Sequence, residues 1–251
     1  MLKFANSPQG PDIPFRESMG TELYRSYGLV VPAWNPIHLT DAFIDQNPSC
    51  WMQTAEGSVR PAAGLCFGSR YLGSYGERLF EVLPGNWFTR VHNRTSFWLA
   101  WAIDVCARHT DNRQAVFVSQ PSGEIRAYFM DHGHLFGGQS DAHRNYIAAS
   151  RYLDARIYPS LTARAVNQLR RQVSVIHVDE LWKKAQSLPE EWRTAPAIYA
   201  FGQGLNRLST HKHIADVIEQ ITEQAGHQNS HHMHSVVTMR ENPRALAANI
   251  S

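Results

Sequence analysis

The sequence has few cysteines, little net charge and no long apolar run, and each of these shortages excludes a class of protein. Three cysteines among 251 residues, scattered and in apolar surroundings, are typical of reduced thiols and not of a disulfide framework. A formal net charge of +2 provides no basic field, so we expect no direct binding to nucleic acid. Because no stretch of about 18 apolar residues occurs, we expect no membrane span. The N-terminus lacks a signal-peptide pattern, which favours a cytoplasmic protein.

What the sequence does contain is typical of a globular protein with mixed secondary structure. Hydrophobic residues make up 43% and charged residues 18% of a chain long enough for one large domain or two lobes. A sheet-containing first part followed by a helical second part predicts an α+β fold. We expect a small lobe over residues 1–75, with a partial sheet and one helix, and a mainly helical lobe over 76–225. A flexible tail would follow over 226–251, where histidine-rich tracts often bind metals only adventitiously.

Hydrophobic periodicity predicts the individual elements. In the first part it predicts an amphipathic helix over 16–27, a short helix capped by Thr40, a loop over 47–64, a strand over 65–73 and a short helix over 76–84. In the second part it predicts helices over 97–107, 141–153, 158–171, 178–187, 197–208 and 210–224. The aromatic residues of the helix over 97–107 are expected in the core.

The most informative stretch follows that helix and is a predicted β-hairpin over 111–131. Two β-runs, 115–118 and 125–130, flank a Pro-Ser-Gly turn. Asp111 precedes the first run and Asp131 follows the second, so a hairpin brings both to the same end. Two carboxylates at one end fit a hard cation such as Mg²⁺. They also fit a division of labour in which one orients a hydroxyl and the other holds the metal. Alternatively, both are turn residues that bound the hairpin.

The hairpin and its flanks resemble a known family. The segment Phe129-Met130-Asp131-His132-Gly133-His134 is similar to the metal-binding Asp motif, the counterpart of Asp-Phe-Gly, in the HipA-like branch of the protein-kinase-like fold. Thr110-Asp111 resembles that family's catalytic loop, and weaker similarity covers residues 2–10, 17–32 and 188–192. The resemblance implies a bilobal protein-kinase-like fold with a truncated small β lobe and a large, mostly helical lobe. The strand over 65–73 would then border the adenine pocket, or else be a simple edge strand.

The same resemblance implies a HipA-like kinase that uses ATP and Mg²⁺ to phosphorylate a hydroxyl, for example on Ser or Thr of a protein, and a toxin–antitoxin connection. Lys3 would contact the nucleotide phosphates and Glu17 would hold Lys3 in place. Asp111 would orient the acceptor hydroxyl, and Asp131 would bind Mg²⁺. Gln114 is the candidate second oxygen donor to metal and cofactor, because the family's Asn is missing at its usual place. Alternatively, Lys3 is a frayed terminal residue, and Glu17 is a surface residue in the first turn of a helix, where the helix dipole favours it.

Three other interpretations remain open from the sequence. The kinase fold has a Gly-rich hairpin before the lysine strand, and only two residues precede the lysine here. Either the true start lies upstream of Met1, or the chain does without this hairpin, or a partner supplies it. The missing hairpin and the absent Asn favour a pseudokinase that binds a nucleotide or a protein partner. A metal-dependent nuclease would use Asp111, Glu124 and Arg126. A zinc site would combine Cys106, His109, His132 and His134.

Overall fold

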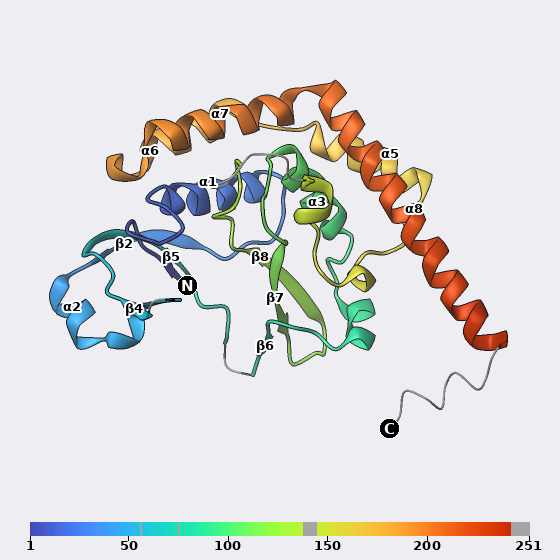
Figure 1. Ribbon diagram of the computed structural model, residues 1–251, viewed down its shortest axis with the longest axis horizontal. Helices are drawn as coiled ribbons and strands as arrows, with labels where there is room; N and C mark the ends of the chain where they lie inside the picture. Colours follow the sequence, from blue (N-terminus) through green and yellow to red (C-terminus); the bar gives the residue numbers. More distant parts are fainter. Residues whose placement is uncertain (56, 75, 138–144, 242–251) are drawn as a thin grey trace.

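The computed structural model describes residues 1–55, 57–74, 76–137 and 145–241, with backbone only beyond residue 226. The protein is a mixed α+β structure with small antiparallel sheets, as the sequence predicts. In Figure 1 the first sheet and α2 lie on the left, the second sheet lies in the centre, and α6 and α7 run above α1. Among the described residues, no helix is long and apolar enough to cross a membrane.

The first sheet has the order β1-β5-β2 and is antiparallel throughout. Its strands are β1 (Leu2–Lys3), β2 (Trp34–Leu39) and β5 (Gly64–Ser69). Strand β5 lies in the middle, so the interpretation of residues 65–73 as an edge strand is wrong. Lys3 lies opposite Phe67, and this register fixes the lysine at the border of the sheet.

Helix α1 (Ile13–Ser26) begins three residues before the predicted start and carries a proline in its first turn, where the missing N–H costs nothing. The prediction of an amphipathic helix is wrong, because residues 13–24 are all buried, including Arg16, Glu17 and Glu22. One face packs on the first sheet and another on α6 (Val178–Ser187). A helix covered on several sides loses the polar stripe that the prediction requires.

A small excursion follows β2. Helix α2 (Asp41–Gln46) is capped as predicted, with the Thr40 hydroxyl accepting a hydrogen bond from the Phe43 N–H at 3.2 Å. The predicted loop over 47–64 instead contains a 3-10 turn (Pro48–Cys50) and the hairpin β3 (Met52–Thr54) and β4 (Gly57–Val59).

The second sheet has the order β6-β7-β8 and contains the predicted hairpin. Strands β7 (Gln114–Ser119) and β8 (Ile125–Met130) pair along their whole length, with Gln114 opposite Met130, so the hairpin prediction is confirmed. The short helix predicted over 76–84 is wrong, because this segment forms β6 (Arg78–Phe80) on the edge of β7. Tertiary pairing overrides local periodicity in so short a segment. A 3-10 helix (Gly85–Arg90) follows.

The helical part agrees with the sequence more closely. Helices α3 (Ser96–Cys106), α6 and α7 (Ala195–Ser209) are confirmed, whereas α5 (Ala163–Val173) starts later than predicted because Thr162 caps it. Of the predicted helix 141–153, residues 141–144 lie outside the described residues, and the rest forms only α4 (Tyr146–Ala149). A 3-10 turn (Ala155–Ile157) follows it. A further 3-10 turn (Glu190–Trp192) precedes α7. Helix α8 (His211–Glu241) continues well past residue 226, where the tail was predicted. The histidine cluster lies outside the described side chains.

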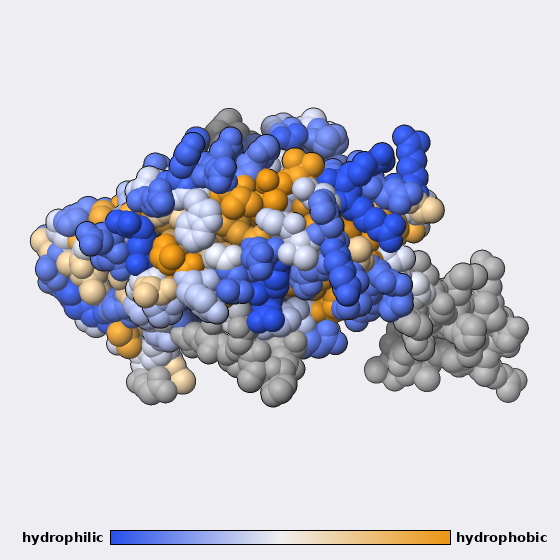
Figure 2. Space-filling view, turned by 90° about the horizontal axis from the view of Figure 1, so that it is seen from above, coloured by the Kyte–Doolittle hydropathy of each residue, from blue (hydrophilic) through white to orange (hydrophobic). Residues whose placement is uncertain are grey.

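One hydrophobic core joins both sheets to the helices. Its largest buried side chains are aromatic, and Trp101 of α3 stacks on Trp98 while its indole N–H donates to the Ile147 carbonyl oxygen at 2.9 Å. The aromatic residues of α3 are therefore core residues, as predicted. Seen from above, hydrophilic side chains surround a strip of apolar surface in the middle of the molecule (Figure 2).

Candidate functional site

Three charged side chains from distant parts of the chain meet between the first sheet, α1 and the end of β8. The Lys3 ammonium nitrogen lies 2.8 Å from Asp131 Oδ1 and 3.2 Å from Glu17 Oε1. The Glu17 side chain is fully buried, and those of Lys3 and Asp131 are 15% and 18% exposed. We call these three residues the lysine–carboxylate cluster. The sequence analysis singled out all three, and the structure brings them together.

Local backbone geometry fixes the cluster. Glu17 lies in the second turn of α1, and its Oε2 accepts a hydrogen bond from the His132 N–H at 2.9 Å. Asp131 has a φ of +59°, in the left-handed region. A non-glycine residue there costs about 1–3 kcal/mol, although Asp tolerates it better than most. Such backbone strain is frequent at functional sites, where the surrounding structure fixes the position of a side chain.

The charges in the cluster do not balance, and this shifts their protonation. Burial raises the pKa of Glu17 to about 7, with Asp131 adding to the rise and Lys3 opposing it. Burial also works against the charged forms of Asp131 and Lys3. However, their mutual attraction lowers the pKa of Asp131 and, with Glu17, raises the pKa of Lys3. Near neutral pH the cluster therefore holds a charged Lys3, a charged Asp131 and a partly protonated Glu17.

Asp111 lies outside this cluster. Its Oδ1 accepts a hydrogen bond from the Asn112 N–H at 2.8 Å, and its side chain is 46% exposed. Its Oδ2 is 4.0 Å from His134 Nε2, and His134 also helps to lower the pKa of Asp131. The two aspartates are therefore at the same end of the hairpin and share His134 as a neighbour. The Asp131 carboxylate, however, is directed to Lys3.

The candidate metal ligands do not gather in one place. In the part of the chain that the structure describes, no three His, Cys, Asp or Glu side chains form a group that could hold a metal ion. Gln114 is exposed at the start of β7, where it lines the same groove as Asp111. Asn112 is engaged elsewhere, because its side-chain amide donates to the carbonyl oxygens of Ala149 and Arg151 at 3.1 and 3.2 Å.

Two buried side chains join the loop of Asp111 to the loop of Asp131. His109 Nδ1 lies 2.5 Å from the Asp111 carbonyl oxygen, and its Nε2 lies 3.5 Å from that of Asp131. Burial holds the pKa of His109 well below its usual range, so the ring is neutral and its single N–H donates to only one of these two carbonyl oxygens. Arg113 Nη1 donates to the Met130 carbonyl oxygen at 2.9 Å. The two loops are therefore held together by side chains between them.

Arg113 belongs to a buried network that the sequence analysis missed. Its Nε and Nη2 donate to the two carboxylate oxygens of Asp104 at 2.7 and 2.8 Å, and the Tyr24 hydroxyl donates to Asp104 Oδ1 at 2.6 Å. Both members of the ion pair are almost fully buried, with side-chain exposures of 1% and 0%. A signal was present in the sequence, because Asp104 interrupts the otherwise apolar helix SFWLAWAIDVC, and a buried charge requires a partner.

The residues of the rival interpretations do not assemble. Glu124 and Arg126 lie at the turn end of the hairpin and contact each other at 3.6 Å, at the opposite end from Asp111, so the predicted nuclease cluster does not form. Cys106, His109, His132 and His134 do not form a zinc site either, since the described residues contain no group of three such side chains that could hold a metal ion. No protein-family model, curated protein or solved structure matches this chain.

Proposed function

We propose that the protein is a HipA-like, protein-kinase-like phosphotransferase that uses ATP and Mg²⁺ to phosphorylate a hydroxyl. The observation that carries this proposal is the lysine–carboxylate cluster. A lysine on a strand, a glutamate on the following helix and an aspartate directly after a β-hairpin are the parts that a kinase needs to hold phosphates. All three occur here, and the Lys3 ammonium lies within 3.2 Å of both carboxylates.

The charge of the cluster supports a cationic ligand. Two carboxylates face one ammonium group, and Glu17 Oε1 is buried with an ion pair to Lys3 but with no hydrogen bond from a described residue. A cation beside Asp131 would offset this excess negative charge and favour the ionised form of Glu17. Asp131 would hold Mg²⁺, and the metal would neutralise charge on the phosphates. Gln114 lines the groove of Asp111 and not the lysine–carboxylate cluster, so we give it no part in holding the metal.

The chain's own residues would contribute mainly by positioning. Lys3 would hold phosphate oxygens, and Glu17 would keep Lys3 extended toward them. Asp111 would orient the acceptor hydroxyl and accept its proton as the new phosphate ester bond forms. Because positioning and charge stabilisation supply most of the rate in phosphoryl transfer, loss of either aspartate would lower the rate by orders of magnitude.

Thermal unfolding with ATP and Mg²⁺, together with transfer of labelled γ-phosphate, tests this function. A ligand at a hundred times its dissociation constant stabilises the folded state by about 2.7 kcal/mol. We expect such a shift in the native chain and in Asp111→Asn, no shift in Asp131→Asn, and phosphate transfer by the native chain only. The absence of both shift and transfer in the native chain would refute the proposal.

A pseudokinase that binds a nucleotide or a partner without transfer is the second candidate. The observation that favours it is Asn112, whose amide is used for the carbonyl oxygens of Ala149 and Arg151. The catalytic loop therefore presents no asparagine to a second metal ion. A nucleotide-dependent shift without any phosphate transfer would support this candidate over the kinase.

A further inference from the structure

The edge of β7 is unpaired next to Asp111. On β8, the backbone N–H of Ala127 donates to Asn93 Oδ1, and that of Phe129 donates to the Val30 carbonyl oxygen. The backbone N–H and C=O groups of these two residues therefore point away from β7. In an antiparallel pair, residues whose backbone groups bond to the partner strand alternate with residues whose backbone groups point away from it. The backbone groups of Phe117 and Ala115, which lie opposite Ala127 and Phe129, therefore point to the other edge of β7.

Strand β6 covers only part of that edge. It pairs with Phe117–Ser119 and ends at Phe80, opposite Phe117. No backbone hydrogen bond links Ala115 to another described residue on this side. The N–H and C=O of Ala115 therefore point to the side of β7 that is uncovered where β6 stops, although the residue as a whole is only 5% exposed. An unpaired strand edge of this kind is a template for an added strand.

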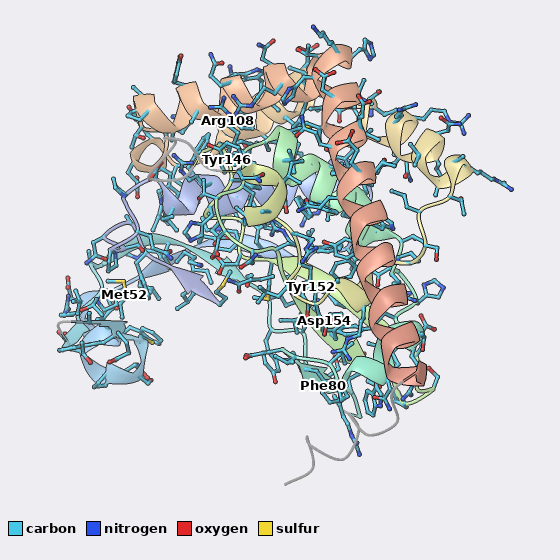
Figure 3. All side chains as sticks on the ribbon, turned by 45° about the vertical axis from the view of Figure 1, so that its right-hand side comes forward. Met52, Phe80, Arg108, Tyr146, Tyr152 and Asp154 are labelled. Atoms are coloured by element: carbon cyan, nitrogen blue, oxygen red, sulfur yellow. The ribbon has the colours of Figure 1, made fainter. Side chains whose placement is uncertain are left out.

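A groove of about 510 Å³ lies along this edge and includes Asp111. Gln114, Ala115 and Val116 of β7 line it, and the segment with Tyr152 and Asp154, both labelled in Figure 3, forms another side. Two apolar side chains at its border are far more exposed than is usual for their type: Val82 is 80% exposed and Leu153 is 75% exposed. These residues suit an aliphatic side chain of a ligand.

The charge of the groove is negative. Its lining includes Glu81, Asp111 and Asp154. Glu81 is exposed and makes no ion pair with a described residue, whereas Asp154 pairs with Arg156 at 2.6 Å. The cation in the lining, Arg113, is withdrawn into its buried pair with Asp104.

We propose that this groove binds an extended, positively charged peptide, which adds to the edge of β7 at Ala115 and presents a Ser or Thr hydroxyl to Asp111. Backbone pairing would supply the extended conformation, and Glu81 would select basic residues beside the hydroxyl. Val82 and Leu153 would contact an aliphatic neighbour. This inference rests on the proposed function, because it names the acceptor of that phosphate transfer.

Direct peptide binding tests the inference separately from catalysis. Fluorescence anisotropy of the full chain would compare a labelled peptide with one serine between leucine and arginine residues against its counterpart with glutamate in place of arginine. We expect the arginine peptide to bind at least tenfold more tightly. N-methylation of single backbone nitrogens along the arginine peptide should weaken binding at the position that pairs with Ala115, because it removes the donor of an added strand.

A charge reversal in the protein gives the matched comparison. Glu81→Lys should weaken binding of the arginine peptide roughly fivefold, whereas Glu180→Lys, an exposed glutamate on α6, should not change it. Any one of three results would overturn the inference: equal binding of the two peptides, binding that no N-methylation weakens, or binding of the arginine peptide that Glu81→Lys leaves unchanged. Peptide binding without any nucleotide-dependent shift or transfer would instead refute the kinase function and leave the peptide groove standing.

Discussion

The buried ion pair between Asp104 and Arg113 gives the sharpest prediction about stability. Arg113→Met removes two hydrogen bonds to Asp104 and one to the Met130 carbonyl oxygen. It leaves a fully buried carboxylate with only the Tyr24 hydroxyl as donor. Breaking a buried pair in this way costs about 3–5 kcal/mol. For a chain of this size we expect a fall in Tm of about 10 °C.

The pH dependence of that loss identifies its cause. Burial raises the pKa of Asp104, and Arg113 opposes the rise, so the variant would hold Asp104 protonated to a higher pH than the native chain does. An acid whose folded pKa exceeds its unfolded pKa loses stability as the pH rises between the two values. The deficit of Arg113→Met should therefore be smaller at pH 5 than at pH 8.

Urea unfolding of four proteins measures this prediction: the native chain, Arg113→Met, Asp104→Leu and the double variant. The double variant should be more stable than Arg113→Met, because it removes the unpaired charge. If Arg113→Met lowered the free energy of unfolding by less than about 1 kcal/mol, with no dependence on pH, Asp104 and Arg113 would not form a buried ion pair.

Three further predictions concern the lysine–carboxylate cluster and the contact between α1 and the loop after β8. Lys3→Met should abolish the nucleotide-dependent thermal shift, and a retained shift would show that Lys3 does not hold phosphates. Glu17 has a folded pKa of about 7, above its ordinary value, so its contribution to stability is present at acidic pH and is lost as the pH rises to about 7. Glu17→Gln should therefore remove up to about 3 kcal/mol of this pH dependence in unfolding measured from pH 5 to pH 8. A Cβ atom on Gly20 would lie 2.4 Å from the Cβ of His132, so Gly20→Ala should lose about 1–3 kcal/mol in urea unfolding. Gly226→Ala, with nothing within 4 Å, should instead gain about 0.5–1 kcal/mol, and equal effects at both glycines would contradict the contact.

The hairpin was predictable from the sequence because its determinants are local. The turn residues lie between two β-runs, and they set the register that puts Gln114 opposite Met130. Strand β6 was not predictable, because three residues have too little local preference and pair only once β7 is in place. Helix α1 was predicted in place but not in its surroundings, since periodicity cannot indicate that a second and third face will also be covered.

The candidate site also has residues that the sequence could indicate and contacts that it could not. Lys3, Glu17 and Asp131 come from segments up to 128 residues apart, so no spacing rule brings them together. The hairpin pattern singled out Asp131, whereas only the resemblance to a family named Lys3 and Glu17 in advance. The pair of Asp104 and Arg113 was missed, although an acid within an apolar helix is a local signal. It indicates that a partner exists, but it does not say which of the many cations in the sequence the partner is.

Helix α1 explains why these separate parts form one site. Arg16 donates a hydrogen bond to the Leu135 carbonyl oxygen at 2.5 Å. The Glu17 carboxylate forms an ion pair with Lys3 of β1 and accepts a hydrogen bond from the His132 N–H. Glu22 pairs with Lys184 of α6 and accepts a hydrogen bond from Trp34 of β2 at 2.9 Å. One helix therefore ties the loop after β8, the first sheet and α6 to one another. Because these bonds share one rigid helix, α1 cannot shift without breaking the contact between Lys3 and Glu17 together with the support of the Asp131 loop.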